Sequence, residues 1–311
     1  MARKKKNKPE GPPTKMEDLA TLTKVNLNTF VLVTAIFGYL LASRYYHGTW
    51  VNDLWLLVNM IIGTACTAFG SAAFNQLIEI DEDAQMERTA DRPLPAKRMS
   101  PLNAFGIGWG LAAFGIIHLA VTVNAPAAYL SAAALGTYVF LYTPLKRKSS
   151  TNTLLGAVPG AIPPMIGWAA IAMEEGGGGS WLDGRSWYLF AFLFLWQMPH
   201  FVAISWMCRE DYEKGGYVMW SNGDVSGKKT AAIAIFFTVL LTALAPVGYL
   251  LGYANTVWAI GGTLIGLVML RLCMKFKGQG DRPSARKLFL YTLLYLPLGL
   301  VLLAIGWKSG L

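Results

Sequence analysis

Charge is scarce in this chain. Only 14% of its 311 residues are charged and 54% are hydrophobic, which gives a mean hydropathy of +0.40. Soluble chains carry roughly 25% charged residues, so this sequence has too few charges to coat one or two soluble domains. Its apolar content also excludes an intrinsically disordered chain. The class that fits is a polytopic membrane protein.

Cysteine is scarce as well. The three cysteines, Cys66, Cys208 and Cys273, lie in or beside apolar runs and share no Cys-x-x-Cys spacing. These positions exclude a disulfide framework and favour structural thiols over a metal or redox centre. The net charge is +9, but no stacking aromatic residues interleave the basic segments, so we expect no nucleic-acid partner.

Long apolar runs are abundant, and nine of them reach the length of a membrane-spanning helix. A helix needs about 20 apolar residues to cross the hydrocarbon core of a bilayer. The runs do not alternate apolar and polar residues as the strands of a β-barrel do. We therefore predict an all-α fold with nine transmembrane helices and short loops. The predicted spans are 26–44, 54–78, 102–121, 124–143, 153–173, 187–207, 230–252, 255–274 and 288–307.

The distribution of Lys and Arg predicts the orientation of these spans. With the N-terminus in the cytoplasm, only Arg44, Arg185 and Lys308 fall on the outer side, and the other 24 of the 27 basic residues are cytoplasmic. The positive-inside rule expects such a bias. We predict a cytoplasmic N-terminus and an outer C-terminus, with a basic tail over 1–25. A single membrane domain, embedded in the lipid bilayer, would cover 26–307.

One short window holds a third of the acidic residues. Six of the 18 acids fall within 79–91, directly after the second span. Acids are costly at the bilayer centre, so the window belongs at a helix end or in a wet cavity. On one continuous helix, Asn75, Glu79 and Asp83 would share a face. Crowded carboxylates repel each other unless a cation holds them, and hard oxygen ligands suit Mg²⁺ together with substrate phosphates.

Two arginines follow the acids at once. Arg88 and Arg92 offer donors for phosphate oxygens. The alternative is a solvated helix end without a function. The density of acids, the polar Asn75 inside a span and the arginine pair favour a phosphate and metal site.

Polar residues form two further clusters. One follows the fourth span and contains Tyr142, Lys146, Arg147 and Asn152. Its charge alone also suits a positive-inside anchor. The other surrounds the end of the sixth span and contains Gln197, His200, Arg209, Asp211 and Tyr212. A polar residue in a span usually faces the bundle interior, although a lone histidine is more often structural. We expect the loops after the second and sixth spans to face each other.

These motifs resemble those of the UbiA-type intramembrane prenyltransferases over about residues 20–307. The Met-Glu-Arg-Thr element has the form found in the branch of the family that farnesylates haem. The elements that carry the resemblance are Leu22-Thr23-Lys24, Asn75-x₃-Glu79-x₃-Asp83, Met86-Glu87-Arg88-Thr89, Arg92-Pro93-Leu94, Tyr142-Thr143-Pro144-Leu145-Lys146-Arg147 with Asn152, Trp196-Gln197-Met198-Pro199-His200-Phe201, Asp211-Tyr212 with Gly216, Ala285-Arg286-Lys287-Leu288-Phe289 and Tyr295-Leu296-Pro297.

The resemblance implies a Mg²⁺-dependent enzyme that acts on farnesyl diphosphate and haem B. A haem vinyl group would attack C1 of the farnesyl chain, and water would add, giving haem O and diphosphate. It also implies a bacterial inner-membrane protein whose active site lies on the cytoplasmic side. A haem A synthase or an oxidase assembly factor is the candidate partner.

The residues and the resemblance together assign the site. We expect catalytic roles for Asn75, Asp83, Arg88 and Lys146, and metal binding by Glu79, Asp83 and Asp211. The expected substrate-binding residues are Arg92, Tyr142, Arg147, Asn152, Gln197, His200, Arg209, Asp211 and Tyr212. Two features depart from the family pattern. Glu79 stands where Asp is usual, and the second acidic motif is reduced to Glu210-Asp211.

Two other functions compete with this interpretation. Another UbiA-type enzyme would prenylate an aromatic acid or a quinone precursor, but the Met-Glu-Arg-Thr and Trp-Gln-Met-Pro-His-Phe elements favour haem. A transporter would need ionisable residues near the middle of the membrane. Here almost all of them lie at one predicted face.

Overall fold

The computed structural model describes residues 13–173 and 179–310, so residues 1–12 of the expected tail lie outside the described residues. Within the described ranges, nine helical segments are long and apolar enough to cross a membrane, as the sequence predicts. The helices are α1 Lys15–Leu22, α2 Val25–His47, α3 Leu54–Ile78, α4 Ile80–Gln85, α5 Pro101–Thr122, α6 Ala125–Gly136, η1 Thr137–Tyr142, α7 Thr143–Leu145, α8 Asn152–Ala161, α9 Pro163–Ala172, α10 Gly184–Met207, α11 Arg209–Lys214, α12 Lys228–Leu250, α13 Thr256–Gln279 and α14 Arg282–Gly306.

Two of the predicted spans are interrupted. The fourth runs through α6, the π-helix η1 and the short α7, and π-helical turns inside helices are frequent at functional sites. The fifth divides into α8 and α9 at Ile162, directly before Pro163 and Pro164. Proline has no N–H to donate and clashes with the preceding turn, so it ends α8 and starts α9.

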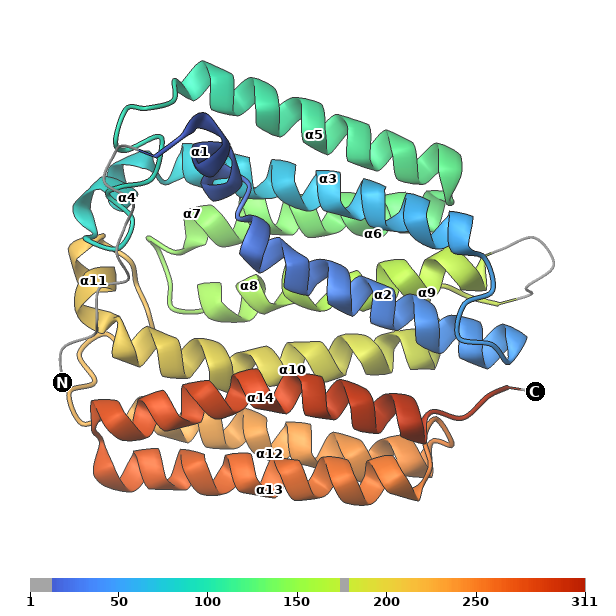
Figure 1. Ribbon diagram of the computed structural model, residues 1–311. Helices are drawn as coiled ribbons and strands as arrows, with labels where there is room; N and C mark the ends of the chain where they lie inside the picture. The colour runs from blue at the N-terminus through green and yellow to red at the C-terminus, as the bar shows by residue number, and fades with distance from the viewer. Residues whose placement is uncertain (1–12, 174–178, 311) are drawn as a thin grey trace.

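The long helices lie side by side, and three of the short helices gather at one end of the bundle (Figure 1). α3 packs against α5, α2 against α9, and α12 against α13. The helices α1, α4 and α11 share one end, and the C-terminal residues leave α14 at the other. An odd number of spans places the first and last described segments at opposite ends.

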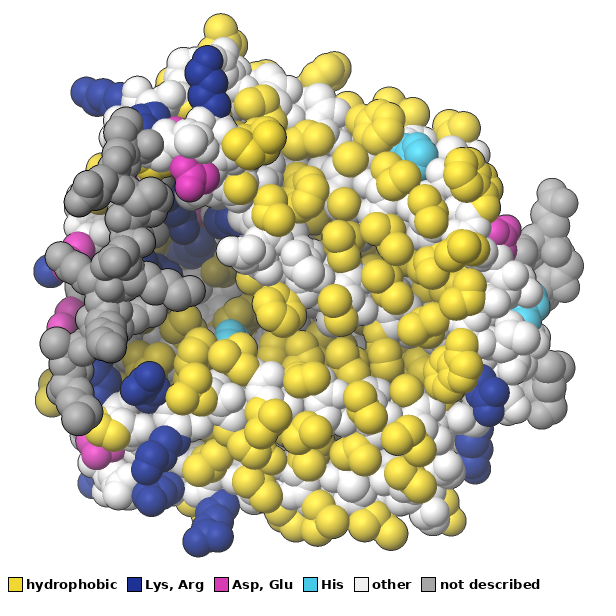
Figure 2. All heavy atoms as spheres, viewed as in Figure 1, with side chains coloured by type: hydrophobic (Ala, Val, Ile, Leu, Met, Phe, Trp, Pro, Cys, Tyr) yellow, Lys and Arg dark blue, Asp and Glu magenta, His cyan; other side chains and the backbone are white. Residues whose placement is uncertain are grey.

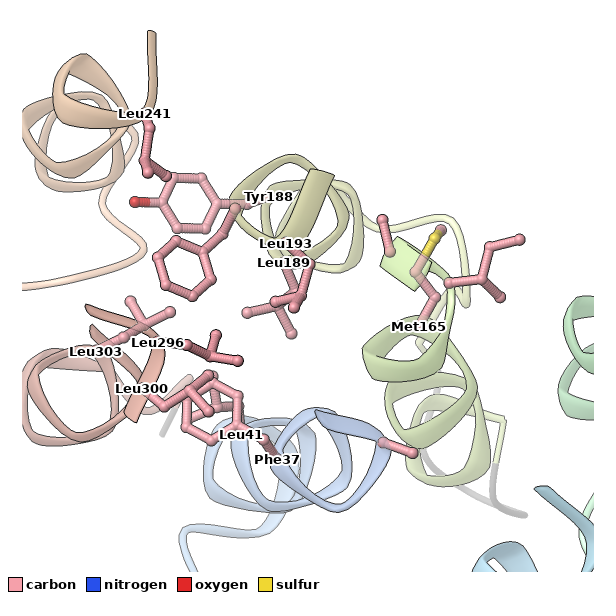
Figure 3. Packing of buried hydrophobic residues seen from close by; sticks show 14 of the residues in the cluster. Phe37, Leu41, Met165, Tyr188, Leu189, Leu193, Leu241, Leu296, Leu300 and Leu303 are labelled. Atoms are coloured by element: carbon pink, nitrogen blue, oxygen red, sulfur yellow. The ribbon is translucent and has the colours of Figure 1, made fainter. Parts of the chain in front are cut away.

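The core lies where α2, α9, α10, α12 and α14 meet. Figure 3 shows Leu41, Leu189 and Leu300 from three of these helices pointing toward one another. The face of the bundle seen in Figure 2 is apolar along its length, and the charged side chains on it gather near the two ends. Trp109 and Val121 on α5 are among many large apolar side chains that are exposed. Such a surface is stable against lipid and would aggregate in water.

An apolar groove runs along the bundle between α2 and α14. Its volume is about 370 Å³, and its walls come from residues 33–40 and 297–304. The first stretch lies in the middle of α2 and the second in the last third of α14, so the groove lies within the two spans.

The end of the expected tail belongs to the fold. α1 begins with a capping box in which Thr14 and Glu17 bind each other's backbone N–H groups. Asp18 on α1 is buried and accepts hydrogen bonds of 2.8–3.1 Å from the Arg98 guanidinium. The ion pair ties α1 to the loop that follows α4.

Candidate active site

The acidic window begins at a break between two helices. α3 ends at Ile78, Glu79 has φ −102° and ψ 21°, and α4 starts at Ile80. The prediction that 75–83 form one continuous helix is therefore wrong. The four-residue hydrogen-bond pairing continues across the break, because Glu79 N–H donates to the Asn75 carbonyl at 3.1 Å and Asp83 N–H to the Glu79 carbonyl at 2.8 Å.

Glu79 forms a buried ion pair with Lys146. The distance between Lys146 Nζ and Glu79 Oε1 is 2.7 Å, and only 11% and 4% of the two side chains are exposed. The ammonium group also lies over two aromatic rings, 4.6 Å from the Tyr142 centroid and 5.4 Å from the Tyr217 centroid. Cations are attracted to the faces of aromatic rings, so these rings help to hold Lys146 in place.

Asp83 pairs with Arg92 in the same way. Arg92 Nη1 lies 2.6 Å from Asp83 Oδ2, and the aspartate side chain is 2% exposed. The buried Thr89 hydroxyl donates to the Asp83 carbonyl at 2.9 Å and so folds the loop back toward α4. The loop thereby delivers the arginine to the carboxylate.

A third carboxylate, Glu82, pairs with Arg147 at 2.6 Å. Arg147 also donates to the carbonyl of Ile78 at 2.9 Å, where it binds one of the last free carbonyls of α3. The second carboxylate oxygen of Glu82 is buried without a hydrogen-bond partner among the described residues. This acceptor is available to a ligand.

Lys24 belongs to the site, although its sequence position predicts a place in the basic tail. Its backbone adopts the left-handed conformation, with φ 48°, which is uncommon for residues other than glycine. The side chain turns inward and donates hydrogen bonds to Asn75 Oδ1 and, at 3.3 Å, to the Tyr138 hydroxyl. Gln76, fully buried, donates to two carbonyls at the end of α1 at 2.6 and 3.1 Å and fixes this connection. The feature of the sequence that could have indicated Lys24 is its place as the last basic residue before the first span.

The buried charges change one another's proton affinity. Burial alone would raise the pKa of Glu79, but the Lys146 and Lys24 ammonium groups outweigh it and hold this pKa below its ordinary value. Burial alone would lower the pKa of Lys146, and the Glu79 charge keeps it well above the usual value. Burial, together with the Arg92 and Lys146 charges, lowers the pKa of Lys24 to about 7.

The loops after α3 and α10 meet over this cluster, as the sequence predicts. The Arg88 guanidinium carbon lies 5.5 Å from the centroid of the Tyr212 ring. Met86 packs with Tyr217 and Met219 in a small apolar cluster of its own. The hydroxyl of Tyr217 is buried without a partner among the described residues, which makes it a second polar group available to a ligand.

Asn152 positions the loop that carries Lys146. Its amide nitrogen donates to the carbonyls of Ser149 and Val218, both at 2.7 Å. The N–H of Val218 in turn donates to the Lys146 carbonyl at 2.7 Å. Because both amide hydrogens bind backbone, we assign Asn152 to positioning instead of substrate binding.

Two other expected substrate contacts also bind backbone. Gln197 donates to the carbonyls of Ala157 and Leu193 at 3.4 and 3.0 Å and is buried. Arg209 donates to the Trp206 carbonyl at 3.1 Å and lies over that indole ring at 4.5 Å. Both residues hold α10 and its end in place.

His200 lies deeper in the bundle, seven residues before the end of α10. Its ring stacks on Trp196 and on Phe289, with centroid distances of 5.5 and 4.9 Å. Nδ1 is 2.9 Å from the hydroxyl oxygen of Thr292 on α14. At 1.5 Å rise per residue, the imidazole is about 10 Å from the helix end that leads into α11.

The donor set fits Mg²⁺ in kind. Within 13–173 and 179–310, no three Asp, Glu, His or Cys side chains are grouped so that they could hold a metal ion, so Glu79, Asp83 and Asp211 form no ready cage. Magnesium in proteins usually takes one or two carboxylates and completes its shell with water and substrate phosphates. The unpartnered oxygen of Glu82 beside Asp83 is consistent with that mode.

One face of the molecule is hollowed at this end. Figure 2 shows Lys and Arg side chains inside the hollow and a histidine side chain at its edge. A basic interior of this kind attracts an anionic group and leaves the apolar flanks to the lipid.

The fold matches several solved structures. A digeranylgeranylglyceryl phosphate synthase superposes with a TM-score of 0.76 at 16% identity, covering 94% of this chain and 98% of that one. A UbiA homologue from Aeropyrum pernix has a TM-score of 0.68 at 20% identity, with 88% and 97% covered. One from Archaeoglobus fulgidus, bound to GPP and Mg²⁺, has a TM-score of 0.58 at 13% identity, with 92% and 99% covered.

The sequence matches curated proteins at higher identity. Protoheme IX farnesyltransferase from Solibacter usitatus is 38% identical over 294 residues, which cover 93% of this chain and 98% of the relative. The mitochondrial protoheme IX farnesyltransferase of Arabidopsis thaliana is 36% identical, with 89% and 62% covered. The sequence model of the UbiA prenyltransferase family matches residues 31–305. With these matches and the paired charges at one end of the bundle, the chain belongs to the UbiA prenyltransferase family.

Proposed function

We propose that this chain transfers the farnesyl group of farnesyl diphosphate to a vinyl group of haem B, giving haem O and diphosphate. The observation that carries the proposal is the buried cluster in which Glu79 and Asp83 are paired with Lys146 and Arg92 beneath two joined loops. The names of the relatives, protoheme IX farnesyltransferase, supply the donor and the acceptor.

The cluster suits a departing diphosphate. Three basic side chains, Lys24, Lys146 and Arg92, lie beside the carboxylates and can donate hydrogen bonds to phosphate oxygens. Arg88 lies over Tyr212 at the junction of the two loops, from which it can close over the same group. Donors that are already fixed stabilise developing charge without reorganisation during the reaction.

We assign the metal-binding role to Glu79, Asp83 and Asp211. Mg²⁺ held there would neutralise negative charge on the diphosphate, as metal ions do for leaving oxygens in other phosphate-displacing sites. The Asn75 amide stands at the start of this group, bound to Lys24 and, at 3.2 Å, to the Thr143 hydroxyl. It orients the ammonium group of Lys24.

The farnesyl chain and the haem occupy the drier part of the site. As the bond between C1 and oxygen breaks, diphosphate leaves with the electron pair, and the terminal vinyl carbon of haem bonds to C1. Water then adds to the resulting cation and loses a proton, which gives the hydroxyethylfarnesyl group. The ring centroids of Tyr138 and Tyr142 are 5.4 Å apart, and Lys146 lies over the Tyr142 ring. The faces of these two rings can stabilise the positive charge that develops on the allylic carbons.

We assign His200 to the haem side of the reaction. The imidazole is about two turns from the end of α10, a depth that leaves the haem propionates at the wet surface. We also propose a bacterial inner-membrane location with the cluster facing the cytoplasm, since 24 of the 27 basic residues fall on that side. A haem A synthase or an oxidase assembly factor would receive the product.

Pigment analysis of membranes tests the proposal directly. Cells that lack a haem-farnesylating enzyme, once they express this chain, should accumulate haem O, identified by chromatography and mass. Purified protein should use haem B and not 4-hydroxybenzoate as the acceptor. Prenylation of 4-hydroxybenzoate without haem O would favour the quinone-precursor alternative, and absence of any Mg²⁺-dependent diphosphate release would favour a transporter.

Separate substrate titrations test the two halves of the site. Arg88→Ala and Lys146→Ala should weaken the use of farnesyl diphosphate, because each removes a positive charge from the leaving-group end. His200→Ala should weaken the use of haem and leave farnesyl diphosphate binding close to normal. Equal damage to both substrates in His200→Ala would return this residue to a structural role.

A further inference from the structure

We propose that Thr292 is a positioning residue for the haem substrate. Its hydroxyl selects the tautomer of His200 that carries the proton on Nδ1 and leaves the Nε2 lone pair for the haem iron. The inference rests on the proposed function, and it deepens that function by naming the iron contact and the residue that prepares it.

The contact joins two helices that are far apart in the sequence. His200 on α10 and Thr292 on α14 are 92 residues apart, with 2.9 Å between Nδ1 and Oγ1. Thr292 is fully buried, so water does not compete for its hydroxyl. The hydroxyl therefore has only protein groups with which to form hydrogen bonds.

The position of the hydroxyl proton decides the tautomer. Thr292 Oγ1 lies 2.6 Å from the carbonyl oxygen of Phe289, one turn earlier on α14. A carbonyl can only accept, so the single hydroxyl proton points to Phe289. The oxygen then acts as an acceptor toward His200, and Nδ1 must donate. In a neutral imidazole, the other nitrogen then carries a lone pair.

Thr292 is itself held at a second point. Its carbonyl accepts a hydrogen bond of 2.8 Å from the indole N–H of Trp196. The same indole stacks on the His200 ring at an interplanar angle of 22°, and the Phe289 ring stacks on the His200 ring at 29°. The stacking contacts fix the plane of the His200 ring, and the hydrogen bond to Thr292 fixes the orientation of the ring within that plane.

The second ring nitrogen is left open. Nε2 of His200 has no hydrogen-bond partner among the described residues, and the side chain is half-buried at the α10–α14 contact. Because the ring is only half-buried, a ligand can approach this lone pair. A histidine that binds metal usually donates its other N–H to a protein acceptor, which fixes the ring and raises its basicity. The pair has this arrangement before any ligand is bound.

Ferric haem B is the probe for the test. It is titrated into the purified full chain in lipid nanodiscs without farnesyl diphosphate, and binding and iron ligation are followed by absorption and electron paramagnetic resonance. The wild type and Thr292→Ser, which keeps the hydroxyl, should show imidazole-ligated haem. Thr292→Val should bind haem about 10- to 100-fold more weakly, as is typical of lost outer-shell partners, and His200→Ala should lose imidazole ligation.

Two further variants separate positioning from packing. Thr238→Val removes another fully buried hydroxyl, one that lies 3.4 Å from the Cys273 thiol on a different helix pair, and should leave haem ligation unchanged. Thr292→Ala removes the same hydroxyl with a smaller side chain and should reproduce the effect of Thr292→Val even if the valine variant does not fold.

The outcomes distinguish the inference from the proposed function. Wild-type haem affinity and spectra in a folded Thr292→Val or Thr292→Ala protein would overturn the inference. Imidazole ligation that survives in His200→Ala would also overturn it. A wild type that makes haem O without imidazole-ligated haem would refute the inference alone, whereas a wild type that makes no haem O would refute the proposed function.

Discussion

Lys146 and Glu79 form a buried ion pair between residues that are 67 positions apart in the sequence, with 2.7 Å between their charged atoms. The pair joins the end of the fourth span to the break after α3. Around it lie Lys24, Arg92 and Asp83, so the proposed leaving-group end of the site depends on this contact.

Removal of one member of this pair should cost stability as well as activity. Lys146→Met leaves the Glu79 carboxylate buried without its partner, and an uncompensated buried charge of this kind costs about 3–5 kcal/mol. The temperature of thermal unfolding in detergent and the rate of farnesyl diphosphate turnover should both fall. The double variant Lys146→Met with Glu79→Gln should recover much of the stability and none of the turnover. A double variant no more stable than the single one would contradict the prediction.

Asp83 and Asp81 offer a matched comparison on one short helix. Asp83 is buried and paired with Arg92, whereas Asp81 is exposed. Asp83→Ala should lower turnover by about 100-fold or more at saturating Mg²⁺, since a lost metal ligand removes several kcal/mol of charge stabilisation. Asp81→Ala should leave turnover near that of the wild type. Equal activity in the two variants would remove Asp83 from the site.

Lys24 should give the free enzyme a pH dependence near neutrality. Its pKa is lowered to about 7, so the ammonium form dominates below pH 7 and the neutral amine above it. If the cation binds diphosphate, kcat/KM for farnesyl diphosphate falls as the pH rises through about 7, because this ratio reports groups of the free enzyme. In Lys24→Arg the guanidinium stays charged, and the fall should disappear from this range. The same fall in Lys24→Arg would assign it to another group.

The orientation of the bundle can be measured with reporter fusions. Fusions within 79–101 and within 208–229 should both report the cytoplasm. These loops lie on the side of the bundle that carries most of the basic residues, and that side is predicted to be cytoplasmic. Fusions at Gly48 and Gly252, after the first and seventh spans, should report the outer side. A site loop found outside would place the proposed chemistry on the wrong face.

Local properties of the sequence were sufficient for the span count. A run of about 20 apolar residues must form a helix in lipid, because no water is present to bind free backbone groups. All nine expected segments are therefore present in the described chain, although Pro163 and the π-helix at Thr137–Tyr142 interrupt two of them. The acidic window and the basic loops were also evident, since charge near a span stands out against its apolar background.

The partners of those charges were decided only by the tertiary structure. Spacing along a chain does not say which cation reaches Glu79, and the answer came from a loop 67 residues away. Lys24 reaches Asn75 because a left-handed backbone turns it inward, and the contact between His200 and Thr292 exists because α10 packs against α14. Composition and periodicity determine which segments enter the membrane, but a buried charge is stable only where packing supplies its counter-charge, and packing is a property of the whole bundle.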